Sequence, residues 1–197
     1  MDDVVLIAVS KGHPPETIRE AYGCGLRDFG ENYAQELRGK AEVLADLPEL
    51  RWHMIGHVQG NKVKVLAPLV TAVHTVDSLR LLSRLDAARG ECDRCLEVFI
   101  QVNLSRETQK SGCPPENVGE IIDGAARLAN VEVVGLMLVP ARAELGERRA
   151  SFRELRELAE QHGLSGLSMG MSEDYEVALK EGATHVRVGQ ALFGPRP

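Results

Sequence analysis

The sequence predicts an α/β protein whose single domain, spanning residues 1–197, is a closed (β/α)8 barrel, or TIM barrel. Short apolar runs rich in β-branched residues recur along the chain, and segments with helical spacing of apolar residues lie between them. Several runs are apolar almost throughout, as expected of parallel strands buried on both faces. About eight strand–helix units follow one another without a linker, which favours a barrel over an open sheet. The chain is short for this fold, which usually takes about 250 residues.

The strands are expected where β-branched residues cluster, and the helices where apolar residues form a stripe. The clearest stripe follows Pro114-Pro115, and Asp77-Ser78 offers a cap for another helix. No helix is expected before the first strand. The predicted strands are 4–9, 27–29, 51–55, 72–75, 96–102, 131–138, 166–168 and 185–188, and the predicted helical stripes are 18–22, 33–44, 82–88, 118–129, 155–159 and 178–179.

Composition and charge exclude several classes of protein. Hydrophobic residues make up 44% and charged residues 26%, as in ordinary globular proteins. No apolar run approaches the roughly 18 residues of a membrane helix, and the acidic start Met1-Asp2-Asp3 is unlike a signal peptide, so we expect a cytoplasmic protein. With 23 basic and 29 acidic residues the net charge is −6, which argues against nucleic-acid binding.

Two residue pairs invite a metal or redox interpretation. Cys92 and Cys95 have the spacing of half a zinc site or of a redox pair, but no second such pair exists, so two plain thiols at the start of a strand are favoured. His53 and His57 lie on a strand and its following loop, with no carboxylate placed to complete a site. We therefore predict no metal.

The functional residues are expected at the carboxyl ends of the strands, where barrel enzymes carry their sites. Lys11 follows the first run and is either an ordinary loop lysine or a residue that forms a Schiff base. Asn32 follows the second run and could cap a helix or bind a ligand.

The last two strand ends predict a phosphate site. The stretch 167–172, Leu-Ser-Met-Gly-Met-Ser, is expected to leave a strand and enter a helix, and its small residues would let backbone N–H groups approach an anion. Gly189 ends the eighth run, and barrels commonly bind phosphate after strands 7 and 8. A lysine after strand 1 and a phosphate-binding site after strands 7 and 8 together suggest pyridoxal 5′-phosphate (PLP).

Eleven short blocks, in order along nearly the whole chain, carry a resemblance to a known family. The sequence resembles the YggS/PROSC family of pyridoxal phosphate homeostasis proteins, with a barrel similar to the N-terminal domain of alanine racemase. It departs from the family in lacking the usual leading helix and in carrying His57. The blocks are Ala8-Val9-Ser10-Lys11, Gly30-Glu31-Asn32, Gln35-Glu36, Trp52-His53-Met54-Ile55-Gly56, Gln59-Gly60-Asn61-Lys62, Asp77-Ser78, Gln101-Val102-Asn103, Lys110-Ser111-Gly112, Gly135-Leu136-Met137, Leu167-Ser168-Met169-Gly170-Met171-Ser172 and Val186-Arg187-Val188-Gly189.

On the ring side of the cofactor, the resemblance implies that Lys11 holds PLP covalently as a Schiff base. Asn32 would lie beside the cofactor, with Met54 and Ile55 near the ring. Arg187 would face either the ring nitrogen or the phosphate, and an arginine at the ring nitrogen weakens PLP as an electron sink.

On the phosphate side, the resemblance implies that Ser172, Gly189 and the backbone of Gln190 bind the phosphate, with Ser168 and Met169 close by. Lys62 and Lys110 are expected to be solvated charges rather than secondary contacts to PLP.

The function implied by the resemblance is that of a non-catalytic carrier that buffers PLP and hands it to apo-enzymes, and we expect a monomer. The chain ends soon after the phosphate segment, which leaves no room for the further domain that gives alanine racemase its second base. A small PLP-dependent racemase would need that base from His53, Tyr33 or Lys62. A third hypothesis is a sugar-phosphate enzyme that uses Lys11 without PLP.

Overall fold

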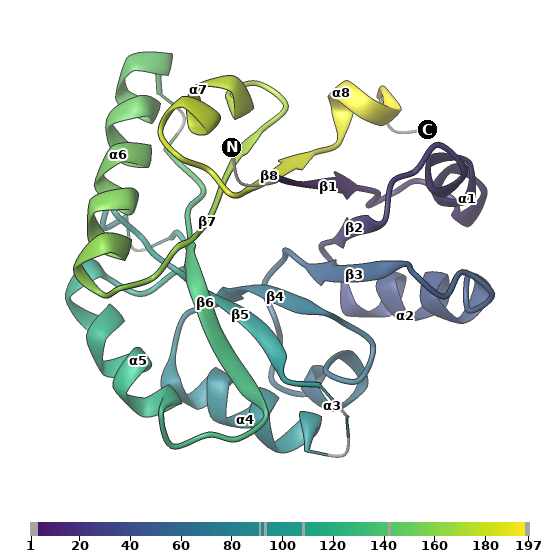
Figure 1. Cartoon of the computed structure of the whole chain (residues 1–197), viewed down its shortest axis with the longest axis horizontal. Coiled ribbons are helices and arrows are strands. Elements are labelled where there is room, and N and C mark those ends of the chain that lie inside the picture. Colours follow the sequence, from purple (N-terminus) through teal and green to yellow (C-terminus); the bar gives the residue numbers. More distant parts are fainter. Residues whose placement is uncertain (1–3, 91, 93, 108, 142, 196–197) are drawn as a thin grey trace.

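Eight parallel strands close a barrel in the computed structural model, which describes residues 4–90, 92, 94–107, 109–141 and 143–195. Each strand pairs with the next along the chain, and β8 returns to pair with β1 (Figure 1). This topology confirms the predicted (β/α)8 fold. The strands are β1 (Val5–Val9), β2 (Asp28–Glu31), β3 (Arg51–Met54), β4 (Ala72–Val76), β5 (Leu96–Gln101), β6 (Val131–Met137), β7 (Gly166–Met171) and β8 (His185–Val188).

The helices surround the strands and cover the outside of the barrel (Figure 1). Two of them, α3 and α8, are only four residues long and were not predicted, because so short a segment shows no helical periodicity. The helices are α1 (Pro15–Gly23), α2 (Ala34–Val43), α3 (Val63–Leu66), α4 (Leu79–Arg89), α5 (Val118–Ala125), α6 (Leu145–Gln161), α7 (Tyr175–Lys180) and α8 (Gln190–Phe193), with a 3-10 turn, η1 (Pro115–Asn117), before α5.

Local sequence explains several of these boundaries. Pro15 opens α1 at a position where its missing N–H is not needed, and Pro115 does the same for η1. The Ser78 hydroxyl accepts a hydrogen bond from the backbone N–H of Leu81 at 3.4 Å, so the predicted cap of α4 is confirmed. In α5 the side chains of Val118 and Ile121 are buried, as the predicted stripe requires.

The predicted end of the seventh strand is wrong, and this error bears on the site. β7 does not stop at Ser168 but continues to Met171, and α7 begins only at Tyr175, so the stretch expected to form an anion-binding loop is mostly strand. The continuation depends on Gly170, which has a φ of 91° and where an added Cβ would lie 2.6 Å from the Ala178 Cβ. A glycine therefore allows α7 to pack directly against the strand.

The core consists of an outer layer between strands and helices and an inner layer inside the barrel. Phe29, Phe99 and Phe152 are among its largest fully buried side chains. His74 and Arg187, however, are also buried, so part of the interior is polar. Among the described residues no helix is both long enough and apolar enough to cross a membrane. The expected absence of a helix before β1 concerns residues 1–3, which lie outside the described part.

Candidate functional site

A cavity of about 730 Å³ opens at the carboxyl ends of the strands. It has the place that barrel folds give to their functional sites. Seven of the ten predicted site residues line it, and together they come from the segments after β1, β2, β3 and β7 and from the end of β8. They are Lys11, Asn32, Ile55, Ser172, Arg187, Gly189 and Gln190.

The other three predicted residues do not line the cavity. Met54 and Met169 are buried in β3 and β7, and the Ser168 hydroxyl contacts Arg187 instead of the open space. Their expected closeness to a cofactor stays a prediction. The structure instead assigns Ser168 to the support beneath the cavity.

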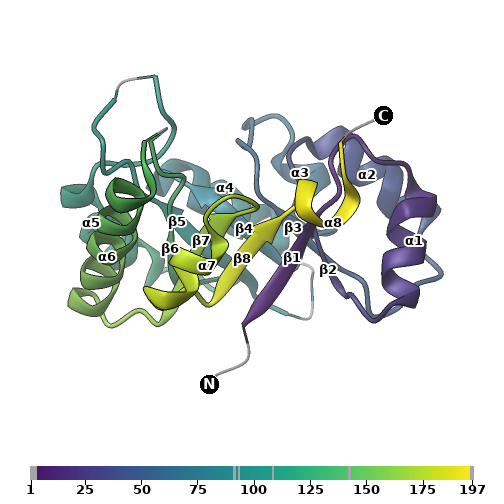
Figure 2. The same cartoon turned by 90° about the horizontal axis from the view of Figure 1, so that it is seen from above.

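The Ser172 hydroxyl and the chain after β8 form one wall of the cavity. Ser172 Oγ accepts hydrogen bonds from the backbone N–H groups of Gly189, at 3.3 Å, and Ala191, at 3.4 Å. A Cβ on Gly189 would lie 3.1 Å from the Val9 carbonyl oxygen, so a glycine lets this segment approach β1. Just beyond, α8 lies beside the segment that leads into α1, where the rings of His13 and Phe193 are 5.3 Å apart (Figure 2). Hydroxyl and backbone donors in this arrangement suit a phosphate.

Arg187 brings a buried positive charge to the floor of the cavity. Its Nη1 donates to Ser168 Oγ at 2.7 Å, and its Nη2 donates to the Leu138 carbonyl oxygen at 2.9 Å. Burial lowers the pKa of Arg187 to about 10, so the guanidinium stays charged at neutral pH. A guanidinium carries five N–H donors, more than these two contacts use, and can also bind an anion or a ring nitrogen that accepts.

The backbone on both sides of Lys11 is anchored by a set of polar and charged side chains that we call the carboxylate–lysine cluster. Its members are Ser10, Glu31, Glu36 and Lys40. The Ser10 hydroxyl donates to Glu31 Oε1 at 2.7 Å, and Lys40 Nζ donates to the Ser10 carbonyl oxygen at 2.8 Å. The Gly12 N–H donates to Glu36 Oε1 at 2.6 Å. The cluster therefore holds the backbone on both sides of Lys11.

Inside the cluster, Lys40 forms ion pairs with Glu31, at 2.6 Å, and with Glu36, at 2.7 Å. Burial raises the pKa of Glu31, against the hydrogen bonds from Lys40 and Ser10 that lower it. Sequence reasoning quoted Glu31 and Glu36 only as parts of motifs. The four-residue spacing of Glu36 and Lys40 on a helix was the signal that could have indicated their pairing.

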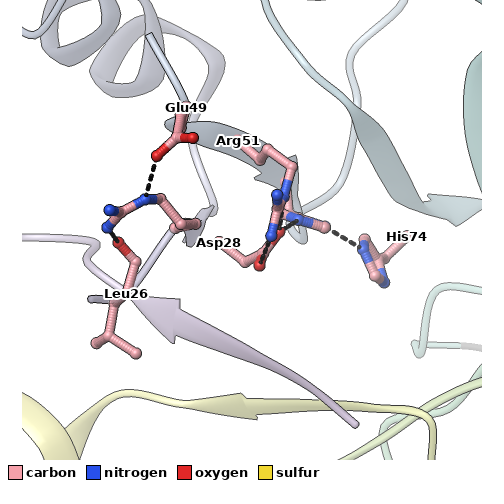
Figure 3. Close-up of polar contacts among 7 residues, drawn as sticks. Leu26, Asp28, Glu49, Arg51 and His74 are labelled. Carbon is pink, nitrogen blue, oxygen red and sulfur yellow. Dashed lines mark hydrogen bonds and ion pairs between the residues drawn. The ribbon is translucent and has the colours of Figure 1, made fainter. Parts of the chain in front are cut away.

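A second set of buried polar groups, which we call the histidine chain, runs through the barrel from Asp28 by way of His53 and His74 to Ser168. The Asp28 Oδ1–His53 Nε2 distance is 2.9 Å, the His53 Nδ1–His74 Nε2 distance is 2.9 Å, and the His74 Nδ1–Ser168 Oγ distance is 2.8 Å. Figure 3 shows the outer end of this chain, where Arg51 pairs with Asp28 and His74 lies beyond them. Sequence reasoning missed it, because its members come from four different strands.

The cysteine pair and the histidine pair noted in the sequence do not form part of a metal site among the described residues. Cys92 and Cys95 are free thiols, and residue 93 between them lies outside the described part of the chain. His53 belongs to the histidine chain, whereas His57 is exposed. Within the described residues, no group of three or more histidine, cysteine or acidic side chains could hold a metal ion.

None of the three bases considered for a racemase lines the cavity. His53 is buried and hydrogen-bonded to Asp28 and His74, Tyr33 is 67% exposed, and Lys62 lies in the segment before α3. The cavity is lined by Lys11 and by donors suited to an anion, and also by His13, Glu173 and Asp174.

Known proteins resemble this chain over nearly its whole length. The sequence profile of the alanine racemase N-terminal domain matches residues 4–197. A protein of Pseudomonas aeruginosa named pyridoxal phosphate homeostasis protein is 48% identical over 98% of this chain and 85% of its own length. The human protein of the same name is 38% identical over 97% and 76%.

Solved structures show the same relationship. PipY of Synechococcus elongatus, determined with PLP bound, is 40% identical and has a TM-score of 0.90, covering 98% of this chain and 94% of PipY. Alanine racemase of Clostridium difficile is 15% identical and has a TM-score of 0.76. The match covers 100% of this chain and 54% of the racemase, and it shows a shared fold only.

Proposed function

The chain belongs to the alanine racemase N-terminal domain family and, within it, to the pyridoxal phosphate homeostasis proteins, and from this we propose that it is a PLP-binding protein of PLP homeostasis. It holds PLP covalently but reversibly on Lys11 and acts as a single barrel domain, in the cytoplasm and as a monomer. It buffers the cofactor and delivers it to apo-enzymes. The observation that carries the proposal is that Lys11, Ser172 and Arg187 line one cavity.

The covalent step needs only an amine and an aldehyde. Lys11 Nζ adds to the aldehyde carbon of PLP, a carbon–nitrogen double bond forms, and one water molecule leaves, so that hydrolysis reverses the step. PLP so bound supplies a conjugated ring that can accept electrons. The residues of this chain hold and orient it.

The cavity offers suitable partners for each part of the cofactor. The Ser172 hydroxyl, Gly189 and the backbone of Gln190 bind the phosphate, and Asn32 and Ile55 flank the ring. Arg187 donates either to the ring nitrogen or to the phosphate. Met54, Ser168 and Met169 act from below the cavity.

A non-catalytic role is favoured over racemisation. Inverting Cα requires a base on each face of the substrate, and none of the three bases considered for that role lines the cavity. The relatives carry the name of homeostasis proteins instead of an enzyme name. Arginine at a ring nitrogen would also keep PLP a poor electron sink.

The decisive experiment compares wild type with Lys11→Ala, using Lys62→Ala and Lys110→Ala as matched controls. Wild type and both controls should show a visible absorbance band with PLP, and borohydride should trap PLP on the peptide that contains Lys11. Lys11→Ala should lose both signals. A trapped adduct on another lysine would refute the proposal. Absence of the band in wild type would also refute it and would favour the enzyme that uses Lys11 without PLP.

A second measurement separates carrier from racemase. Wild type loaded with PLP is incubated with L-alanine in D2O, and the formation of D-alanine and of Cα-deuterated alanine is followed. A carrier should give no more product than free PLP at the same concentration. Rapid deuteration with D-alanine formation would make the protein a racemase.

A further inference from the structure

Arg187 is connected to the opposite end of the barrel by an unbroken series of hydrogen bonds. Its Nη1 donates to Ser168 Oγ at 2.7 Å, and Ser168 is followed by His74, His53 and Asp28 at distances of 2.8–2.9 Å. Ser168 and His74 are fully buried, and His53 is 3% exposed. Only the last member meets the surface, where Asp28 pairs with the half-exposed Arg51.

The chemistry of the two ends sets the direction of the hydrogen bonds made there. Arg187 can only donate, so Ser168 Oγ accepts from it. At the other end burial raises the pKa of Asp28, but hydrogen bonds from Arg51 and His53 outweigh this and hold it well below its usual range. Asp28 is therefore a carboxylate that can only accept, and His53 Nε2 must carry a proton.

The donors and acceptors in the middle of the histidine chain are set by its two ends and by the protons on His53 and His74. When each histidine ring carries a single proton, His53 Nδ1 accepts from His74 Nε2–H. His74 Nδ1 is then also bare and accepts the Ser168 hydroxyl proton. Each donor thus meets one acceptor, and the bonds all point from the Arg187 cation to the Asp28 carboxylate.

The surroundings of His74 keep it in this neutral form. Phe99 of β5 stacks on its ring, with centroids 4.4 Å apart. The titratable and charged groups that face it are His53 of β3 and His185 and Arg187 of β8. Burial holds the pKa of His74 well below its usual value, and a proton on His53, the Arg187 cation or a proton on His185 lowers it further. A proton on Nδ1 would leave the Ser168 hydroxyl without this acceptor.

We propose that His74 is a positioning residue for the cofactor site, acting through Ser168 to hold the Arg187 guanidinium in the orientation in which PLP meets it. The proposal rests on the proposed PLP-binding function and extends it to side chains that do not line the cavity. His53 and Asp28 complete the chain and fix the proton positions on His74.

The test is a double-mutant cycle on the full chain, read as the dissociation constant of PLP. His74→Phe keeps a ring to stack on Phe99 but removes both hydrogen bonds, and Ser168→Ala is a smaller deletion in case His74→Phe does not fold. Each should weaken PLP binding about tenfold or more, the worth of a hydrogen bond to a charged group. His162→Phe, at an exposed histidine, is the matched control.

The decisive comparison repeats these changes in an Arg187→Met background. If His74 acts through Arg187, the double variants should bind PLP within about twofold of Arg187→Met alone, because the interaction they would break is already gone. Losses that multiply would overturn the proposal, since they would mean a general structural role. His74→Asn, whose amide oxygen can still accept from Ser168, should recover most of the affinity that His74→Phe loses.

A spectroscopic readout decides the case if Arg187→Met binds too weakly to measure. The pH midpoint of the absorbance change of bound PLP should shift by about half a pH unit or more in His74→Phe and Ser168→Ala. It should stay unchanged in His162→Phe. An unchanged midpoint in every variant would overturn the positioning role. Failure of wild type to bind PLP would instead refute the proposed function.

Discussion

The carboxylate–lysine cluster and the histidine chain lie beneath two different parts of the same cavity and bury polar atoms in different ways. Beneath Lys11, Lys40 neutralises the buried charge of Glu31 directly, at 2.6 Å. Beneath Arg187, two histidines separate a cation from the carboxylate of Asp28. Ion pairs offset desolvation only while both partners are present, whereas a hydrogen-bonded chain depends on having every donor matched to an acceptor.

The difference suits what each network supports. The cluster grips the backbone on both sides of Lys11, whose side chain is proposed to make and break a covalent bond. The chain holds a single side-chain group, the Arg187 guanidinium, through one hydroxyl. One network therefore fixes a segment of the main chain and the other fixes the orientation of a side chain.

Removing the lysine of the cluster should have the largest effect on stability. Lys40→Met leaves Glu31 buried without its cation, so the free energy of unfolding should fall by about 3–5 kcal/mol. Urea unfolding of the protein without PLP measures it. Arg38→Met, on the same helix, breaks an exposed pair with Glu42 and should cost about 0.5 kcal/mol or less. Equal costs in the two variants would contradict the difference drawn between buried and exposed pairs.

Acid should weaken the protein through His74, which is buried, and His185, which is partly buried. Burial lowers the pKa of His185 to about 4, and His74 is held neutral in the same way. Between about pH 6.5 and pH 4 the unfolded chain takes up protons that the folded state refuses, so stability falls as the pH falls. From pH 7 to pH 5, His185 alone should account for about 2 kcal/mol of lost unfolding free energy.

Urea unfolding at pH 7 and pH 5 measures this loss of unfolding free energy, and histidine variants show which residue causes it. His185→Phe should remove about 2 kcal/mol of the loss, and His162→Gln, at an exposed position, should leave it unchanged. Glu31 has the opposite sign, because a raised carboxyl pKa means that the folded state takes up a proton more readily on acidification. Stability that stays level or rises toward pH 5 would contradict the neutral histidines.

The smallest difference in unfolding free energy is expected between variants of two buried serines, one in each network. Ser10→Ala removes a hydroxyl that donates to Glu31, and Ser168→Ala removes one that accepts from Arg187. Each should lower the free energy of unfolding by about 1.5–3 kcal/mol, the range for a hydrogen bond to a charged group. Thermal melting with and without PLP separates them further: Ser168→Ala should lose more of the stabilisation that PLP confers. Equal loss of that stabilisation in both variants would remove the distinction.

The fold could be predicted from the sequence because each strand carries its own signal. The predicted range 185–188 agrees with β8, and most other predicted strands differ from the observed ones by one or two residues at an end. The largest error, at β7, arose because Gly170 and its small neighbours suggested a loop, whereas the glycine serves a close helix contact. The contact between Gly170 and Ala178 of α7 exists only in the folded structure, so the sequence could not indicate it.

Much of the candidate site could also be predicted from the sequence. Polar residues after apolar runs, together with the family resemblance, indicated Lys11, Asn32 and Ser172, and all three line the cavity. Met54 and Met169 share their motifs but are buried in strands, because side chains alternate between the two faces of a strand and a motif does not state which face is inside.

The sequence by itself determined the order of the strands, the ends at which the cavity lies and most of its lining, because these depend on periodicity and on residues that follow one another. Glu36 and Lys40 are likewise only four residues apart. The tertiary structure alone decided the histidine chain, since His53 and His74 are 21 residues apart and His74 and Ser168 are 94 apart. No local pattern links residues so distant, and only closure of the barrel brings their side chains within hydrogen-bonding distance.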